Sequence, residues 1–366
     1  MTGSARRFAE QPLLAFAEQV VAGLGAGPEA ARTVAASLVE ADRRGVHTHG
    51  VVRLPSYCAE ARAGRVSPGA EPQVVRQEGP VALMDGGGGF GAVTGAAAIA
   101  LAIDAAERYG IGFVAARGCT HFGAAAFYTL RAVERGLVGI AATSTPAVMA
   151  PWGGAEGRLG NNPLSVAAPM PAGRPPFVLD LAQSAVSRGR IKLAELAGEQ
   201  IPEGWALDGD GRPTRDPAAA LAGALLPSGG YKGSGLALAV EVLTGVLAGG
   251  ELGPELINMS MTGSARSGSA TKAGTVASIY AAVDPERFVG REAFTERMAR
   301  LADLITSTPP AAGFTEVLLP GSLEARAELD ARVRGIPLDD ATVQLLRELG
   351  SDVSVAFPAA LGERLA

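Results

Sequence analysis

The 366-residue chain contains only two cysteines and three histidines. Cys58 and Cys119 are too few for a disulfide framework or for a zinc site of the usual kind. We therefore expect no metal, and a reducing compartment, the cytoplasm, as the location. Charged residues are also scarce, at 19% of the chain, and the net charge at pH 7 is −5. Because no basic stripe is available to neutralise phosphates, nucleic acid is not an expected partner.

Long uninterrupted apolar runs are missing as well. The longest apolar stretches, around residues 92–106 and 236–248, are broken by charge or glycine and fall below the roughly 20 residues that a membrane span needs. Near the N-terminus, Arg6 and Arg7 precede apolar residues at helical spacing, unlike a secretory signal. Hydrophobic residues nevertheless make up 48% of the chain, which predicts a compact globule without a membrane partner.

The three histidines lie in two short polar islands. His47 and His49 follow a predicted helix and precede Arg53, whereas His121 lies within Cys119-Thr120-His121-Phe122-Gly123. Histidine has the unperturbed pKa nearest neutrality, so it suits the transfer of a proton at working pH. A lone histidine is more often structural, but clustering beside Gly, Thr and Arg favours an enzyme with a histidine acid/base and an anion-binding arginine. For His47, a structural and a functional role remain equally open.

Lysine is nearly absent too, with only Lys192, Lys232 and Lys272 among 32 basic residues. Lys232 stands out because Lys232-Gly233-Ser234-Gly235 opens a predicted helix. The free N–H groups and the positive dipole end of a helix N-terminus attract phosphate. A merely solvated lysine is the alternative.

Helical patterns begin and end the chain, and strands alternate with helices between them. Helices are predicted over residues 8–26, 28–44, 54–63, 92–109, 124–135, 236–247, 291–307, 323–333 and 340–350, and strands over 81–84, 111–116, 138–143, 164–168 and 177–181. Residues 201–217 and 251–275 are expected to be loops, the second of them mobile. We expect a helical domain built from residues 1–71 with 291–366, packed on an α/β domain over 72–290.

A glycine run follows the first predicted strand of the α/β domain. Gly86, Gly88 and Gly91 fit the G-x-G-x-x-G pattern of a Rossmann dinucleotide site. Every residue from Gly86 to Gly91 except Phe90 is glycine, however, so almost any glycine spacing would be found. No acidic residue stands at the end of a second strand. We therefore favour a close-approach or flexible turn that does not contact a cofactor pyrophosphate.

A set of collinear motifs resembles the malate/L-lactate dehydrogenase family, the non-Rossmann group that includes sulfolactate, ureidoglycolate and ketimine-reducing enzymes. The motifs are Glu40-Ala41-Asp42-Arg43-Arg44-Gly45, Thr48-His49-Gly50, Arg53-Leu54-Pro55-Ser56-Tyr57, His121-Phe122-Gly123, Thr143-Ser144-Thr145-Pro146, Gly160-Asn161-Asn162-Pro163, Asp180-Leu181-Ala182 and Gly229-Gly230-Tyr231-Lys232-Gly233. The resemblance covers nearly the whole chain and implies a non-Rossmann NAD(P)-binding α/β domain.

The resemblance also implies roles for individual residues. His121 matches the catalytic position that protonates the alkoxide formed by hydride transfer, a step that suits a near-neutral histidine. Arg53 matches the residue that holds the substrate carboxylate, for which its planar fork is suited. Further matches line the substrate pocket (Thr48, His49 and Tyr57) and the NAD(P)H site (Thr145, Asp180, Leu181, Ala182, Lys232 and Gly233). The substrate is then a small carboxylate, and the family's dimers imply a homodimer.

Three functions are compatible with these observations. The first is NAD(P)H-dependent hydride transfer to a small 2-oxo acid, and the second is reduction of a cyclic ketimine or dehydro-amino-acid imine carboxylate. The third is a cofactor-binding protein without turnover, because residues 266–276 lack a stretch often found in the family. Arg53 as a surface ion pair and Asp180 as a helix cap are the structural alternatives for those two residues.

Overall fold

The computed structural model describes residues 5–256 and 273–362, and a seven-stranded mixed sheet lies at its centre. The strand order is β2-β3-β4-β10-β5-β6-β7. The strands are β2 (Gln73–Glu78), β3 (Val81–Asp85), β4 (Ile111–Cys119), β5 (Val138–Thr143), β6 (Leu164–Ala168), β7 (Phe177–Leu181) and β10 (Val276–Val283). Only β3 and β4 pair in parallel, and every other neighbouring pair is antiparallel. A doubly wound parallel sheet is thereby excluded, and the predicted non-Rossmann α/β fold is confirmed.

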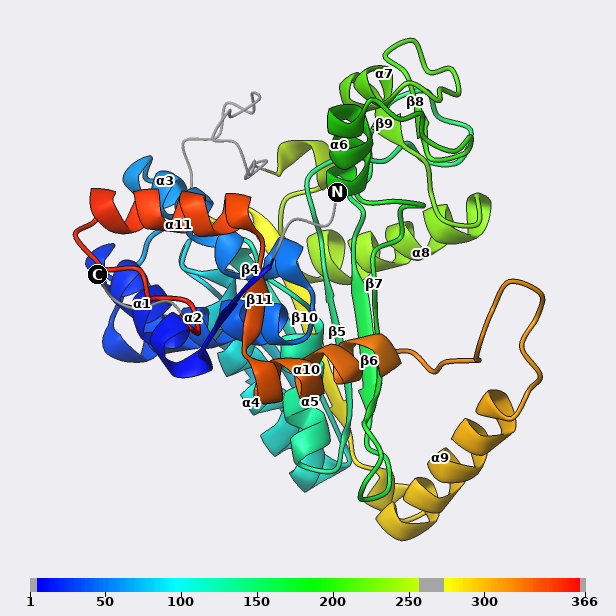
Figure 1. The fold of residues 1–366 in the computed structure, drawn as a ribbon. Helices are drawn as coiled ribbons and strands as arrows, with labels where there is room; N and C mark the ends of the chain where they lie inside the picture. Colours follow the sequence, from blue (N-terminus) through cyan, green and yellow to red (C-terminus); the bar gives the residue numbers. More distant parts are fainter. Residues whose placement is uncertain (1–4, 257–272, 363–366) are drawn as a thin grey trace.

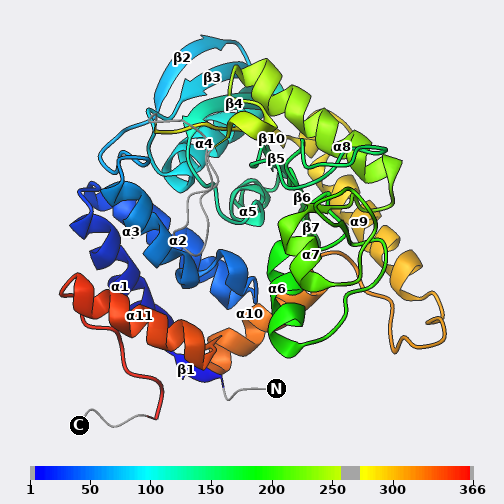
Figure 2. The ribbon, with the colours of Figure 1, turned by 90° about the horizontal axis from the view of Figure 1, so that it is seen from above.

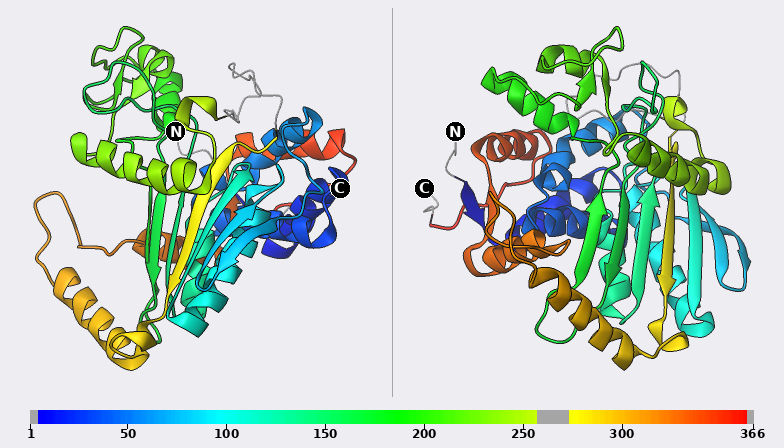
Figure 3. Two further views of the ribbon diagram at one scale, coloured as in Figure 1. Left: turned by 180° about the vertical axis from the view of Figure 1, so that it is seen from behind. Right: turned by 90° about the vertical axis from the view of Figure 1, so that its right-hand side faces the viewer.

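The two faces of this sheet are covered unequally. Helices α4 (Gly91–Tyr109) and α5 (Ala126–Glu134) pack on one face (Figure 1). The other face meets the helical segment made of α8 (Tyr231–Glu241) and a π-helical turn over Val242–Val246. In the right-hand view of Figure 3 the strands are visible between α8 above and α9 (Arg291–Thr306) below. Within the described residues, part of this face therefore has no helix over it.

The helices near the two chain ends share one hydrophobic cluster. Its members come from α1 (Glu10–Gly23), α2 (Pro28–Arg43), α3 (Leu54–Arg62) and α11 (Asp340–Asp352), which lie together in Figure 2. Strand β1 (Arg6–Phe8) pairs antiparallel with β11 (Ile336–Leu338), so the first described strand is joined to the last. The division into a domain of residues 1–71 with 291–366 stays a prediction. Helix α10 (Ser322–Arg334) contacts α2, but α9 extends away from this cluster (Figure 1).

Several elements differ from the sequence predictions. The helix expected to open at Lys232-Gly233-Ser234-Gly235 begins at Tyr231, which agrees with the prediction, but its α-helical part ends at Glu241 and a π-helical turn over Val242–Val246 follows. The loop expected over 201–217 contains β8 (Ala206–Leu207), which pairs with β9 (Ala224–Leu225) beside α6 (Arg188–Ala197) and α7 (Pro217–Ala222). Strands β2 and β10 were not predicted. Of the loop expected over 251–275, residues 257–272 lie outside the described residues.

Apart from the gaps at 1–4, 257–272 and 363–366, the chain contains no helix long and apolar enough to cross a membrane.

Candidate active site

His121 lies on the loop that connects β4 to α5, and the glycine run holds this loop in place. The Thr120 hydroxyl donates to Gly89 O at 3.0 Å and accepts from Gly91 N–H at 3.2 Å. A Cβ on Gly91 would stand 2.6 Å from His121 O, closer than real Cβ contacts allow. The predicted close-approach turn is therefore observed in the run, while the absence of a pyrophosphate contact stays a prediction.

Tyr57 from α3 is the hydrogen-bond partner of His121. Its hydroxyl lies 2.8 Å from His121 Nδ1. Burial raises the pKa of Tyr57 to about 12, so the phenol keeps its proton, and its hydroxyl can donate a hydrogen bond to Nδ1 or accept one from Nδ1–H, according to the tautomer of His121. Burial, followed by the charges of Arg53 and His49, holds the pKa of His121 well below its usual value. Tyr57 therefore occupies Nδ1 of a neutral His121, and Nε2 is the ring nitrogen without a hydrogen-bond partner among the described residues.

His49 and Arg53 reach the same place from a turn made of two short 3₁₀ helices, His47–His49 and Val51–Arg53. The His49 ring stacks on the His121 ring with centroids 5.8 Å apart, and its Nδ1 lies 3.1 Å from Thr48 Oγ1. Arg53 Nε donates to Thr48 O at 2.7 Å within the turn. Burial and then the Arg53 charge lower the pKa of His49 to about 4. The structure thus brings together a neutral histidine pair and a guanidinium.

The residues predicted to bind the cofactor form a second group, near the N-terminus of α8. Thr145 Oγ1 donates to Asn161 Oδ1 at 2.8 Å, and Thr145 N–H donates to Asn162 Oδ1 at 3.0 Å. A Cβ on Gly233 would stand 2.3 Å from Ser228 O, so only glycine fits the close approach of the first helical turn to that loop. Lys232 is exposed beside Gly233. The N–H groups of Gly233 and Ser234 are paired with Ser228 O and Gly230 O. Among the described residues, the N–H groups of Tyr231 and Lys232 have no backbone partner, and they lie at the positive dipole end of the helix.

Asp180 lies between the two groups, at the end of β7. One oxygen of its carboxylate accepts a hydrogen bond from Ala126 N–H at 2.8 Å. Ala126 begins α5, directly after the His121 loop, so the carboxylate stabilises a helix N-terminus. The capping role that the sequence left open for Asp180 is therefore observed. Leu181 is exposed and Ala182 half-buried, so the chain after Asp180 remains accessible.

Sequence reasoning missed three buried polar residues around the α8 group. Asn162 Nδ2 donates to Glu241 Oε2 at 2.7 Å and to Ala237 O at 3.0 Å, which ties the Thr145 loop to α8. Gln183 follows Ala182 directly and is 1% exposed, yet its Nε2 has no partner among the described residues. A buried amide without a partner costs free energy and is expected where a ligand binds. Asn162 was visible only as part of the Gly160-Asn161-Asn162-Pro163 motif.

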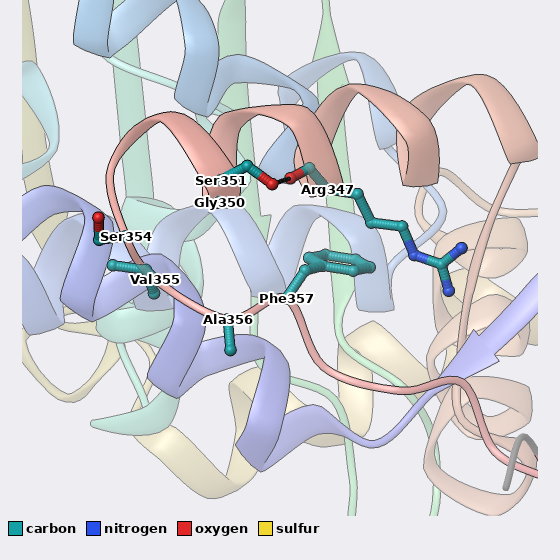
Figure 4. Close-up of a pocket in the computed structure, with 7 residues that line it drawn as sticks. All are labelled: Arg347, Gly350, Ser351, Ser354, Val355, Ala356 and Phe357. Atoms are coloured by element: carbon teal, nitrogen blue, oxygen red, sulfur yellow. Dashed lines mark hydrogen bonds between the residues drawn. The ribbon is translucent and has the colours of Figure 1, made fainter. Parts of the chain in front are cut away.

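The described cavities are not lined by the His121 group. One of about 460 Å³ lies at the end of α11 and is lined by Arg347, Gly350, Ser351, Ser354, Val355, Ala356 and Phe357 (Figure 4). Another, of about 390 Å³, is lined in part by Gly87, Gly88 and Arg117. The Arg117 guanidinium lies 3.3 Å from the Asp85 carboxylate, and Gly87 N–H donates to the same carboxylate at 2.9 Å. These groups are already paired, which leaves little to bind an anion. No cluster of potential metal ligands occurs in the described ranges.

The lowered pKa of His49 predicts a measurable acid sensitivity. The folded protein binds a proton at His49 only near pH 4, whereas the unfolded chain binds it near pH 6.5. The free energy of unfolding should therefore fall as the pH drops from 6.5 toward 4. His49→Gln should reduce this loss by about 2 kcal/mol at pH 5, as measured by urea unfolding at pH 7 and pH 5.

His47 offers a control of opposite sign. Its hydrogen bond to Asp42 raises its pKa above 6.5, so its protonation stabilises the folded state below that pH and the contribution is lost as the pH rises. His47→Asn should not reduce the acid sensitivity. An equal effect of both substitutions would contradict the assignment to His49.

Comparisons with known proteins identify the family. The model of the malate/L-lactate dehydrogenase family matches residues 8–347. L-sulfolactate dehydrogenase from Methanocaldococcus jannaschii is 37% identical over 336 residues, 92% of this chain and 94% of that protein. Delta(1)-pyrroline-2-carboxylate reductase from Ancylobacter novellus is 36% identical over 331 residues, 90% of this chain and 93% of that protein.

The solved structure of sulfolactate dehydrogenase from Methanocaldococcus jannaschii has a TM-score of 0.86 to this fold. It is 34% identical and covers 97% of this chain and 98% of its own. The resemblance seen in the motifs is thus confirmed in sequence and in fold: the chain belongs to the malate/L-lactate dehydrogenase family.

Proposed function

We propose that the protein is an NAD(P)H-dependent oxidoreductase that reduces a small 2-oxo acid to the 2-hydroxy acid, and also runs in reverse. The observation that carries the proposal is the group made by His121, Tyr57, His49 and Arg53. It combines a histidine whose Nε2 is free to exchange a proton with a guanidinium suited to a carboxylate.

Arg53 binds the substrate carboxylate through its planar fork. Before substrate binds, the Arg53 charge helps to keep His121 neutral. The carboxylate offsets that charge, so His121 can take up a proton as the substrate enters. His121 Nε2 then donates the proton to the oxygen of the former carbonyl, while Nδ1–H donates to the Tyr57 oxygen. In the reverse direction His121 Nε2 accepts the hydroxyl proton.

The residues near α8 fit a dinucleotide. Lys232, Gly233 and the helix N-terminus would hold phosphate, and Thr145 with Asp180, Leu181 and Ala182 would hold the rest of the cofactor. The buried Gln183 Nε2 without a partner is an additional donor for it. When bound, NAD(P)H supplies the hydride.

Reduction of a cyclic imine carboxylate is the second candidate function. The pyrroline-2-carboxylate reductase of Ancylobacter novellus, 36% identical to this chain, favours it. Arg53 would hold the carboxylate in the same way, and the substrate nitrogen would replace the carbonyl oxygen.

Incubation with NADH or NADPH and a panel of 2-oxo acids and cyclic imines tests both functions. Loss of absorbance of the reduced cofactor with the oxo acids supports the first function, and loss with the imines alone supports the second. If no member of either panel is turned over, the oxidoreductase assignment fails and a cofactor-binding protein remains.

The two cysteines are free and buried, which supports a location in the reducing cytoplasm.

The protein acts as a homodimer. Residues of α8 and the turn that follows it are apolar and largely exposed: Leu236, Leu238, Val242, Val246 and Leu247. On the sheet face below α8, half-buried Ile140, Val166 and Leu179 stand side by side in register. Apolar surface of this extent needs cover. A second copy provides a complementary apolar surface by two-fold symmetry.

Val246→Asp should break this dimer, because two buried aspartates would face the apolar interface without partners. Light scattering at micromolar concentration should give about twice 37.0 kDa for the parent and 37.0 kDa for the variant. Tyr109→Asp is the control, because Tyr109 is exposed at the end of α4 on the other face of the sheet. A monomeric parent protein would refute the proposal.

A further inference from the structure

Asp42 is a buried carboxylate that lies directly beneath the turn carrying His49 and Arg53. It lies in the last turn of α2 and is 1% exposed. Its two oxygens each accept one hydrogen bond from this turn: Oδ1 from His47 Nδ1 at 2.9 Å and Oδ2 from Val51 N–H at 2.7 Å. His47 begins the first 3₁₀ helix and Val51 begins the second. One carboxylate therefore holds both halves of the turn.

Gly50 shows how closely the turn approaches this carboxylate. A Cβ on Gly50 would stand 2.1 Å from Asp42 Oδ1 and 2.2 Å from Oδ2. The Gly50 φ of −84° is one that any residue can adopt, so the need for glycine comes from the carboxylate and not from the backbone conformation. The contact leaves no room for the turn to shift toward α2.

His47 is the only basic side chain that contacts Asp42 among the described residues. The neighbouring Arg43 and Arg44 pair with Glu10 and Glu328 instead. Asp339, at the start of α11, is a further charge near His47, and its side chain accepts from Thr342 N–H at 2.8 Å. Since a buried carboxylate needs a partner, the half-exposed His47 ring completes the site of Asp42.

We propose that Asp42 and His47 are positioning residues, which fix the turn so that Arg53 and His49 meet the substrate at His121. The inference rests on the proposed function and assigns the third histidine, for which the sequence left two roles open. The turn contributes no residue to the α8 group. We therefore expect the affinity for the substrate, and not the affinity for the cofactor, to depend on Asp42 and His47.

His47→Leu and His47→Asn test the proposal as a pair. Leucine removes the donor to Asp42, whereas the asparagine Nδ2 takes the place of Nδ1. His47→Leu should raise KM for the carboxylate substrate about 10-fold, with kcat and the Kd of the reduced cofactor within about twofold of the parent values. His47→Asn should restore KM to within about threefold. If His47→Leu leaves KM unchanged, raises KM and cofactor Kd together, or behaves like His47→Asn, the proposal is wrong.

A second measurement does not depend on turnover. With three histidines in the chain, protein labelled with histidine that carries ¹³C at Cε1 gives three imidazole signals, and each histidine variant assigns one by its loss. Both His47 variants remove the same ring, so its ring current cancels in their comparison. The His49 signal should move in His47→Leu relative to His47→Asn, and an unmoved signal overturns the proposal. If the parent reduces no carboxylate substrate, the proposed function fails, while this comparison still decides the positioning role.

Discussion

Replacing His121 with alanine is expected to lower kcat by about 10²–10⁴-fold, the range for loss of a general acid/base. His121 combines a ring nitrogen, Nε2, that has no partner among the described residues with a Tyr57 hydroxyl 2.8 Å from Nδ1, which fixes the orientation of the ring. Steady-state rates with saturating substrate and reduced cofactor measure the effect. The Kd of the cofactor, from fluorescence, should stay within about twofold, because its predicted residues lie in the separate α8 group.

Tyr57→Phe is the informative companion variant. It keeps the ring that packs against Phe90 but leaves Nδ1 of His121 without its hydrogen-bond partner, so kcat should fall less than in His121→Ala. If His121→Ala turned over at a rate near that of the parent, the proton would have to come from His49 or Tyr57, and the assignment would fail.

Arg53→Lys is expected to lower kcat/KM for carboxylate substrates by about 10- to 100-fold, while neutral analogues lose much less. Lysine keeps the positive charge but not the planar fork, and a charge-assisted hydrogen bond contributes about 1.5–3 kcal/mol. The Nε bond to Thr48 O at 2.7 Å also disappears, so part of the loss reflects the turn itself. Paired kinetics on an oxo acid and its amide or ester separate these contributions.

Equal losses for the acid and for the neutral analogue would contradict the carboxylate role of Arg53. His49→Gln is the control here, because it removes a neighbour of His121 without removing the guanidinium. It should affect acid and neutral substrates alike.

Local patterns in the sequence predicted most of the helices and the strands β3, β4, β5, β6 and β7 of the central sheet. Pro28 and the apolar spacing of Val34 and Leu38 predicted α2, which begins at Pro28. The central strand β10 was missed because it is buried along its length and has no alternation of apolar and polar residues. It inserts between β4 and β5 from a distant part of the chain, a placement that no local pattern predicts.

The candidate site was predicted through residue types that chemistry requires, such as His121 and Arg53. Their supports could not be predicted in the same way, because they act through contacts distant in sequence. Asn162 reaches Glu241 across 79 residues. Asp42 was visible only as one member of a motif, and its contact with Val51 depends on a turn whose shape the sequence did not reveal.

The pairing of β1 with β11 affects the order in which the chain can fold during translation. On the ribosome, Arg6–Phe8 emerges long before Ile336–Leu338 and has no strand partner until then, because the two strands pair with each other. Phe8 and Leu38 belong to the same core as Val343 and Leu346. In the nascent chain, α2 and the turn that it supports therefore lack their full core until β11 and α11 have been synthesised. A truncated protein without α11 should keep all the residues of the central sheet. It should nevertheless fail to hold the turn with His49 and Arg53 in place beside His121.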